Sequence, residues 1–595
     1  MTKNEDRIIL GVGGYLGHDA NAALLVDGAL IAAAQEERFT RIKHDGAFPT
    51  HAILDCLHRA GLKPDDVDVC VFGEKPVQTV LFDRVGEPGN GFTRALGRWL
   101  PERWGGLHVH QARAMLPRAR FHYAWHHLSH VAGAYHTSRF PRAAFLCVDG
   151  KGEDYCASLG TIDQDSLLLH SEQPYENGLG LLYTLVTHHL GFDSFGSEYK
   201  VMGLAPYGRP RFVDRLSSLF ITDDDGGFRL RHPVKFKTPS MLAAVRLVTE
   251  ATGIPARAKA DPVRAEHVDL AATLQHVFET EVLKMAAFAR RETGEKHLIF
   301  CGGCAQNCVA AGRLRAAGLF DAVFNSPVGG DMGSGLGAAL LYARSTHRGT
   351  PLRIDAKGFY LGSEPGPVPE VARPWQVPYS GALHDYIARQ IAAGKTVGWV
   401  RGRMELGARA LGARSVLADP RAPGMQSRLN LAVKFRESFR PFAPAILAEK
   451  VGDWFDCTAE SDYMNYTANL LPHRRYAVPA EFAGLREQLD TPRSEIQSVI
   501  HVDFSARLQT VRREVHPDFH QLISAFEKET GVPILINTSF NVSGQPIVRT
   551  ATEAWECFLN TDLDLLVLND EVFRNPGERS REQKLAWLAQ FSKLA

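Results

Sequence analysis

Apolar and polar positions at the start of the chain predict a strand followed by a hairpin. Apolar runs over 8–12, 22–26 and 29–33 have the length and composition of buried strands. Asp27-Gly28 separates the last two runs, and this dipeptide is typical of a tight hairpin turn. The N-terminal part of the chain therefore begins as a β-sheet.

Apolar strands that end in glycine-rich turns recur further along, at 145–149 and at 299–303. Glycine then dominates 329–337, which leads into an alanine-rich helix from about Ala338. Backbone N–H groups at such junctions suit phosphate groups, so the repeated pattern indicates a nucleotide held between two α/β lobes. The candidate nucleotide contacts are Gly302, Gly303 and Asn307.

The best linker candidate lies between about 346 and 374, where glycine, proline and charged residues replace the apolar pattern. A second α/β region follows, with an amphipathic helix predicted over 383–393 and a buried strand over 396–400. We therefore expect two α/β domains, at 1–355 and 375–595, joined by a linker at 356–374.

Charge is balanced, with 67 basic and 67 acidic residues in a chain of 595. No net field favours nucleic acid or an anionic membrane, so small molecules are the expected partners. The N-terminus lacks the apolar core of a signal peptide, and no run has the length of a membrane span. We expect a soluble, cytoplasmic protein.

The nine cysteines are scattered and do not form a disulfide framework. Cys301, Cys304 and Cys308 lie where a strand breaks into a glycine turn and then a helix, a geometry that the glycines explain without the thiols. No second cysteine pair has the spacing of a zinc site. We therefore interpret these cysteines as structural.

A candidate metal site lies near the middle of the first domain. Apolar residues recur at helical spacing from Trp125 to Tyr135 and predict a helix with one face packed inward. His126 and His130 are one turn apart on that helix and point the same way. With Asp149 at the end of a nearby strand, they form a plausible site for a divalent metal ion.

Basic residues gather in the second domain among small residues and prolines. The group consists of Arg409, Arg414, Lys434, Arg436 and Arg440. Arginine's planar fork suits phosphate or carboxylate oxygens, and small neighbours let backbone and guanidinium approach one ligand together. As a group they predict an oxyanion pocket, although a salt-bridged surface is the alternative for any one of them.

Polar side chains follow a buried strand predicted over 533–536. Asn537 and Ser539 would lie at the mouth of a sheet, where ligands usually bind. The alternative is a turn in which these side chains bond to their own backbone.

Together these motifs resemble the NodU/CmcH family of ATP-dependent O-carbamoyltransferases over essentially the whole chain. The resemblance implies an N-terminal domain of the actin-like ATPase superfamily, similar to TsaD, and a C-terminal YrdC-like domain. It implies two stages. In the second domain, carbamoyl phosphate and ATP, with Mg²⁺, give carbamoyl adenylate. In the first domain, a hydroxyl of a small-molecule acceptor, such as an antibiotic or another secondary metabolite, takes the carbamoyl group.

The resemblance also implies residue roles. The family's metal-binding positions match His126, His130, Asp149 and Asp331. His127 is a neighbouring histidine that does not match these positions. Iron(II) is the implied metal, while the ligand chemistry equally permits Mn²⁺ or Zn²⁺. Lys200 and Gly203 resemble the segment near the transfer site, and His18-Asp19 and Lys43-His44 resemble further positions. One of these histidines would assist deprotonation of the alcohol. Lys200, His18, Lys434 and Arg440 are the catalytic candidates, and Arg507 matches another motif.

Two alternatives use other chemistry or none. Threonylcarbamoyl transfer to tRNA predicts a basic face, against which the balanced charge argues. A non-catalytic nucleotide-dependent scaffold would need neither the metal group nor the oxyanion cluster. The segment 76–117, with Trp99 and Trp104, is our hypothesis for shaping the acceptor pocket. The sequence specifies neither the acceptor nor the oligomeric state.

Overall fold

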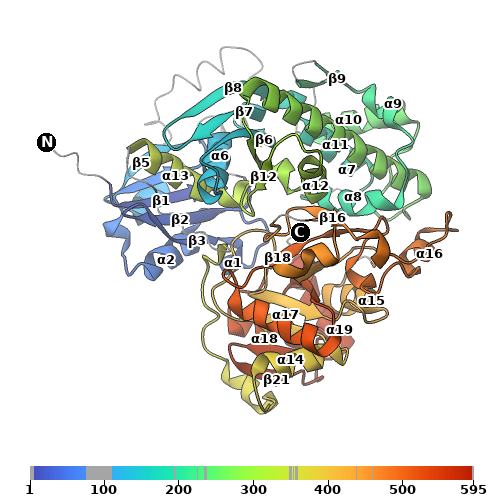
Figure 1. Ribbon diagram of the computed structural model, residues 1–595. Helices are drawn as coiled ribbons and strands as arrows, with labels where there is room; N and C mark the ends of the chain where they lie inside the picture. Colours follow the sequence, from blue (N-terminus) through green and yellow to red (C-terminus); the bar gives the residue numbers. More distant parts are fainter. Residues whose placement is uncertain are drawn as a thin grey trace. The chain divides into compact units, whose positions relative to one another are not determined.

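A computed structural model describes residues 6–15, 17–75, 110–192, 196–223, 226–232, 238–346, 352, 354, 359–436, 438–457 and 460–592. The chain divides into two compact units, each with its own sheets and helices (Figure 1). Unit 1 comprises Met1–Thr40, His44–Asp193 and Pro210–Ala356, and unit 2 comprises Arg41–Lys43, Ser194–Arg209 and Lys357–Ala595. The mixed α/β class expected from the sequence is confirmed.

Unit 1 contains two five-stranded sheets. The first has the strand order β3-β2-β1-β4-β5. Its strands are β1 Ile8–Gly13, β2 Asn21–Val26, β3 Ala29–Gln35, β4 Val69–Phe72 and β5 Arg120–Tyr123. The second has the order β12-β11-β6-β7-β8. Its strands are β6 Arg142–Gly152, β7 Tyr155–Asp163, β8 Leu167–Pro174, β11 His297–Cys301 and β12 Ala322–Asn325.

The two sheets of unit 1 repeat one topology. In each sheet, the first three strands in chain order form an antiparallel meander. The first strand also pairs with the fourth, and the fourth with the fifth, and both of these pairings are parallel. The same strand order and orientation therefore occur twice within unit 1.

The hairpin predicted at Asp27-Gly28 is present between β2 and β3. Both turn residues have positive φ, 49° at Asp27 and 74° at Gly28. This is the backbone that a two-residue turn needs to match the twist of its strands, and aspartate and glycine adopt it more readily than other residues.

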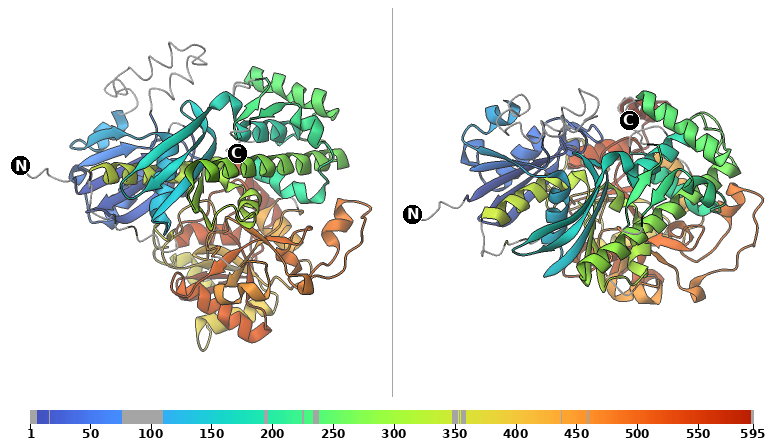
Figure 2. Two further views of the ribbon diagram at one scale, coloured as in Figure 1. Left: turned by 45° about the horizontal axis from the view of Figure 1, so that its top comes forward. Right: turned by 90° about the horizontal axis from the view of Figure 1, so that it is seen from above.

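Helices flank these sheets. They are α1 Glu37–Thr40, α2 Thr50–Arg59, α5 His110–Met115, α6 His126–Thr137, α7 Leu179–His189, α9 Val213–Ser217, α10 Thr238–Thr252, α11 Ala265–Thr293, α12 Cys308–Ala316 and α13 Ser334–Thr346. Figure 2 shows α11 as the long green helix that lies along β6 and β7. A small hairpin of β9 Phe220–Thr222 and β10 Phe228–Leu230 also belongs to unit 1.

Glycines let α13 approach its neighbours closely. A Cβ at Gly337 would lie 1.7 Å from the Ser129 carbonyl oxygen of α6, and one at Gly335 would lie 2.7 Å from Asn21 Oδ1. Side chains at these positions would push α13 away from α6 and β1. The glycine run at 329–337, which we interpreted from the sequence as phosphate-facing, therefore has a packing role as well.

Unit 2 is built on a seven-stranded mixed sheet with the order β18-β15-β19-β14-β13-β20-β21. Its strands are β13 Val397–Val400, β14 Arg414–Ala418, β15 Ala443–Leu447, β18 Gln509–Val511, β19 Ile534–Ser539, β20 Leu565–Leu568 and β21 Glu571–Arg574. A second, two-stranded sheet pairs β16 Thr467–Asn469 with β17 Ser505–Arg507. Trp399, Phe519 and Phe526 are among the largest side chains fully buried in its core.

The helices of unit 2 are α8 Glu198–Leu204, α14 Leu383–Ala392, α15 Met425–Arg428, α16 Leu485–Asp490, α17 Pro517–Thr530, α18 Ala551–Leu559 and α19 Arg581–Ser592. A π-helical turn, η9 Leu429–Lys434, continues α15. Helix α14 packs on α17, which contacts β15 and β19, while α18 contacts β13 and β20. The helix predicted over 383–393 and the strand over 396–400 are confirmed as α14 and β13.

Within the described ranges, every helix is too short or too polar to cross a membrane. Trp99, Trp104 and most of the segment 76–117 lie outside the described residues, so the acceptor-pocket hypothesis stays a prediction.

Candidate metal centre and catalytic site

Helix α6 carries His126 and His130 on one face, as the sequence predicted. Both residues are buried: 5% of the surface of His126 and 1% of the surface of His130 is exposed. The two Nε2 atoms are 2.9 Å apart and converge on the same space. The apolar face of the helix differs from the prediction: Tyr135 is buried, but Trp125 precedes the helix and is only half-buried.

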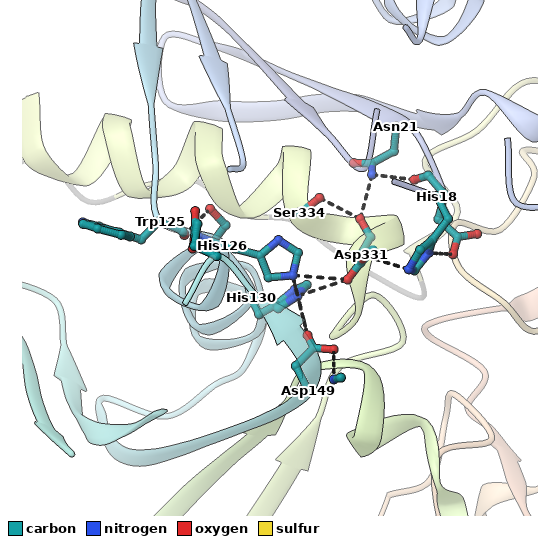
Figure 3. A network of polar contacts seen from close by, with 12 residues as sticks. His18, Asn21, Trp125, His126, His130, Asp149, Asp331 and Ser334 are labelled. Carbon is teal, nitrogen blue, oxygen red and sulfur yellow. Dashed lines mark hydrogen bonds and ion pairs between the residues drawn. The ribbon is translucent and has the colours of Figure 1, made fainter. Parts of the chain in front are cut away.

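Two carboxylates complete the group from other elements (Figure 3). Asp149 comes from β6, and Asp331 opens a short 3-10 turn before α13. Asp149 Oδ2 lies 3.1 Å from His130 Nε2 and 3.6 Å from His126 Nε2. Asp331 Oδ1 lies 3.4 Å from each Nε2 atom. One atom from each of the four residues therefore faces a common centre.

The donor spacing fits a divalent metal ion. Ligands about 2.1 Å from an ion, in a tetrahedral or octahedral shell, stand about 3.0–3.4 Å apart. The separations above run from 2.9 to 3.6 Å. Asp149 Oδ2 is also buried, and its charge faces the two imidazoles without a hydrogen bond of good geometry, which leaves it available to a cation. Two imidazoles and two carboxylates suit Fe²⁺, Mn²⁺ or Zn²⁺.

Electrostatics favour a cation at this position. Burial disfavours the charged form of His130, and so does neighbouring His126, yet hydrogen bonds and charge from Asp149 and Asp331 raise its pKa to about 9. The pKa of each carboxyl is lowered by the imidazoles despite burial. The pocket thus attracts positive charge, and a metal ion would bind there by displacing protons.

Asp331 is held by residues that the sequence had not singled out. Asn21 Nδ2 donates to the Asp331 carbonyl at 2.8 Å, and Asn21 Oδ1 accepts from Gly335 N at 2.9 Å. Ser334 Oγ donates to the same carbonyl at 2.7 Å. A polar Asn21 at the start of β2, 310 residues before Asp331, gave no local signal of this role.

His18 lies beside the metal group and is part of a His–Asp–His chain. Its Nδ1 is 2.8 Å from Asp19 Oδ2, and its Nε2 is 3.3 Å from Asp331 Oδ2. His44 Nδ1 reaches the other Asp19 oxygen at 2.9 Å. Burial lowers the pKa of His18, but the charge of Asp331 and the bond to Asp19 outweigh it and raise the pKa to about 9.

Asp19 and His44 both have positive φ, 61° and 56°, which is strained for these residues. Asp19, Glu37 and His44 also offer ligand atoms within 4.8 Å of one another. Their oxygens are already used, because Glu37 accepts from His44 N at 3.0 Å and pairs with Arg38 at 2.9 Å. We therefore interpret this second group as a hydrogen-bonded support for His18.

His127 and the cysteines stand apart from the metal ligands. His127 Nδ1 is 2.7 Å from Ser158 Oγ, and burial lowers its pKa to about 3, so it is neutral. The nine cysteines are free thiols, most of them buried. Cys147 on β6 and Cys301 on β11 are neighbours in the register of the two strands, as free thiols, which agrees with the structural interpretation of Cys301.

The glycine turn after β11 lies against the metal group. Gly302 has φ of 90°, and a Cβ at Gly303 would lie 2.9 Å from Asp149 Oδ1. Asn307 instead caps α12 by accepting from Ala310 N at 3.0 Å, and it exchanges hydrogen bonds with Gln275. Asn307 thus has a structural role, and its contact with a nucleotide stays a prediction.

Arg414 is the most deeply buried of the candidate cations in unit 2. It lies on β14, is fully buried, and donates to the carbonyl oxygens of five residues. These acceptors are Ser363, Arg401, Gly402, Ala413 and Arg549, at 2.8–3.2 Å. The guanidinium stabilises the surrounding loops and has little to offer a phosphate.

Lys434 ends the π-helical turn and is also buried. Its Nζ donates to the Ser539 carbonyl, to Ser539 Oγ at 3.2 Å, and to Asn541 O and Oδ1 at 3.1 and 2.9 Å. Burial, with Arg436 and Arg440 nearby, lowers its pKa well below the ordinary value. Lys434 and Ser539 thus organise the end of β19 for neighbouring groups, and the role of Lys434 as a phosphate ligand stays a prediction.

The other candidate phosphate ligands of unit 2 with a positive charge are partly exposed. Arg436 Nε donates to Asn430 Oδ1 at 2.6 Å and stacks over Phe442, and Arg440 lies over the ring of Tyr199 at 4.6 Å. Arg409 and Arg507 are half-buried as well.

Asn537 is different from these cations, since it is buried within β19 and not beyond its end. Its amide donates to Ala410 O and to Gln509 Oε1, while its Oδ1 is buried without a hydrogen bond.

Lys200 and Gly203 lie on α8, which belongs to unit 2. The Gly203 carbonyl is 3.2 Å from His501 Nε2, and nothing lies within 4 Å of a Cβ built on Gly203. The structure thus groups Lys200 with Tyr199 and Arg440 in unit 2.

Comparison with known proteins covers both units. A family model described as the carbamoyltransferase N-terminus matches residues 8–340, and one described as the carbamoyltransferase C-terminus matches 388–575. An uncharacterized protein of Synechocystis is 40% identical over 98% of this chain and 99% of its own length. The nodulation protein NolNO of Sinorhizobium fredii is 34% identical over 94% of this chain and 79% of its own length.

The 3'-hydroxymethylcephem-O-carbamoyltransferase of Streptomyces clavuligerus is 29% identical over 94% of this chain and 98% of its own. Among solved structures, component A of the (R)-2-hydroxyglutaryl-CoA dehydratase of Acidaminococcus fermentans covers 57% of this chain and 99% of its own, with 13% identity. Its TM-score of 0.33 is too low to support an argument.

Proposed function

The chain belongs to the carbamoyltransferase family, and on that basis we propose that it transfers a carbamoyl group to a hydroxyl of a small molecule. The observation that carries the proposal is the buried group of His126, His130, Asp149 and Asp331. Such a group has no use in a scaffold, because four convergent buried ligands cost stability unless they bind a cation.

Unit 1 is the proposed transfer domain, corresponding to 1–355, with an actin-like fold that its two sheets of one topology support. A divalent ion, Fe²⁺ by family resemblance and Mn²⁺ or Zn²⁺ by ligand chemistry, would supply positive charge for an adenylate phosphate. His126 and His130 would hold it with the two aspartates. Gly302 and Gly303 are the proposed nucleotide contacts beside Asp149, where side chains would clash with Val148 O and Asp149 Oδ1.

His18 is the proposed base of the transfer step. Its Nδ1 is held by Asp19, and despite burial the charge of Asp331 raises its pKa to about 9. A metal ion bound to Asp331 would neutralise that charge, lower the pKa of His18 and let the unprotonated Nε2 take the proton of the acceptor hydroxyl. The alcohol oxygen then bonds to the carbamoyl carbon, the bond from that carbon to the adenylate oxygen breaks, and AMP leaves. The products are the O-carbamoylated acceptor and AMP.

Unit 2 is the proposed activating domain, corresponding to 375–595 with a YrdC-like fold and a linker at 356–374. There water hydrolyses carbamoyl phosphate to carbamate and inorganic phosphate. A carbamate oxygen then attacks the α-phosphate of ATP, the bond from that phosphorus to the bridging oxygen of the β-phosphate breaks, and pyrophosphate leaves. The partly exposed cations are the proposed phosphate ligands: Arg409, Arg436, Arg440 and Arg507. Lys200 and Asn537 are proposed to orient the substrates, and Mg²⁺ accompanies ATP.

The acceptor is proposed to be a hydroxylated secondary metabolite. One relative is named for a hydroxymethylcephem, and others are named as nodulation proteins. Balanced charge supports a small molecule over a nucleic acid. The segment 76–117 remains our candidate for acceptor recognition.

Separating the two half-reactions by mutation tests the proposal. Arg440→Ala should suppress carbamoyl-phosphate-dependent pyrophosphate release, whereas Arg428→Ala, an exposed arginine on α15, should not. His130→Ala should retain that release but lose transfer to a panel of hydroxylated acceptors by about 100-fold or more. His127→Ala is its control on the same helix. Loss of pyrophosphate release in folded His130→Ala would overturn the assignment of stages.

A further inference from the structure

Glu153 lies in the two-residue turn between β6 and β7, four residues after the metal-ligand candidate Asp149. It is buried, with 7% of the residue exposed, and its ligand atoms are not among the four that converge on the metal centre. Its carboxylate instead accepts from backbone N–H groups. His126 N donates to Oε1 at 3.1 Å and to Oε2 at 3.2 Å, and Lys75 N donates to Oε1 at 3.1 Å.

Helix α6 needs this acceptor. The first N–H groups of any helix lack intrahelical partners, and the residue before the helix usually caps one of them with its side chain. Here that residue is Trp125, which makes no side-chain cap. Glu153 therefore supplies, from 27 residues further along the chain, the side-chain acceptor that the local sequence lacks.

The turn is shaped to bring this carboxylate to the helix. Glu153 has φ of 47°, a strained value for a residue with a side chain. The preceding Gly152 packs directly on the histidines, because a Cβ there would lie 2.5 Å from His127 Cδ2 and 2.8 Å from His126 Cδ2. The segment 149–153 thus supplies a ligand, a close contact for the imidazoles and a cap for their helix.

We infer that Glu153 is a positioning residue that fixes the first turn of α6, and thereby His126, for metal binding. The inference rests on the proposed metal centre. A ligand on the first helical residue moves with any fraying of that turn, and a carboxylate on its N–H prevents fraying. Loss of such supporting contacts typically weakens metal affinity about 10- to 100-fold.

Metal binding by the full-length chain tests the inference without an activity assay. Zn²⁺ affinity is measured by competition with a chelator, and the visible absorption of Co²⁺ reports the ligand geometry. Glu153→Ala should bind Zn²⁺ about 10- to 100-fold more weakly than wild type and change the Co²⁺ spectrum. Glu153→Gln keeps an acceptor oxygen, so it should recover part of the affinity.

Glu36 provides a matched control in the same unit. It is buried, and its carboxylate caps α2 by accepting from His51 N at 3.2 Å and Ala52 N at 2.8 Å. The residue before α2, Pro49, makes no side-chain cap either. Glu36→Ala should therefore destabilise the fold much as Glu153→Ala does, while Zn²⁺ affinity stays at the wild-type value.

The outcomes separate the inference from the proposal beneath it. Wild-type Zn²⁺ affinity in Glu153→Ala, with wild-type binding abolished by His130→Ala, would overturn the positioning role alone. Binding that His130→Ala leaves intact would overturn the metal centre and the positioning role with it. Equal losses of affinity in Glu36→Ala and Glu153→Ala would also overturn the inference, because general destabilisation would then explain both.

Discussion

Replacing Arg414 with methionine should destabilise unit 2 without touching a substrate. Arg414 is fully buried and donates to five carbonyl groups. Two of these carbonyls keep backbone donors in the variant, since Met404 N bonds to Ser363 O at 3.0 Å and Arg401 N to Ala413 O at 3.1 Å. The other carbonyls lose their bond to the guanidinium, at about 1–3 kcal/mol for each buried acceptor left unsatisfied.

The net loss is about 3 kcal/mol, because removing a buried charge recovers part of its desolvation cost. For a unit of this size such a loss lowers the melting temperature by about 6–12 °C. Differential scanning calorimetry measures the shift, and pyrophosphate release at a temperature well below melting measures activation. Release should persist in Arg414→Met.

Arg409→Met is the matched comparison, because Arg409 lies in the loop just before β14 but is only half-buried. It should lose pyrophosphate release while melting within about 2 °C of wild type. A folded Arg414→Met that melts like wild type and yet releases no pyrophosphate would refute the reasoning, since Arg414 would then act on a substrate.

Three further predictions concern helix packing, the choice of metal-binding histidines and the dependence of stability on pH. Gly337→Ala should lower both stability and metal content, because its Cβ would lie 1.7 Å from the Ser129 carbonyl oxygen; unchanged metal content by elemental analysis contradicts this. His127→Gln should keep wild-type metal stoichiometry, since its Nδ1 bonds to Ser158. Burial lowers the pKa of His516 to about 4, so below pH 6.5 the unfolded chain binds a proton that the folded chain does not. Stability should fall by up to about 3 kcal/mol between pH 6.5 and 4, and His516→Asn should flatten that slope in urea unfolding.

The fold could be predicted where signals are local. Asp27-Gly28 predicts its hairpin because both residues tolerate positive φ. The spacing of apolar residues along 383–393 predicts α14 directly. The repetition of one sheet topology within unit 1 could not be predicted, because strand order depends on pairings between distant segments such as β6 and β11.

The metal group was predictable because His126 and His130 are one helical turn apart, whereas Asp331 entered only through family resemblance. The sequence did not show how deeply the candidate residues are buried. Arg414 has the sequence of a phosphate ligand, but five carbonyls from scattered positions surround it. Asn307 carried a usable signal, since asparagine before an alanine-rich run favours a helix cap. Glu153 was missed because its partner, the N–H of His126, lies 27 residues away.

The most direct test of carbamoyl transfer is pyrophosphate release by wild-type protein given ATP, Mg²⁺ and [¹⁴C]carbamoyl phosphate without an acceptor. The account predicts release that stops when carbamoyl phosphate is omitted, together with a labelled adenylate. Release that is indifferent to carbamoyl phosphate, or its absence from folded, metal-loaded protein with and without hydroxylated acceptors, would contradict the account.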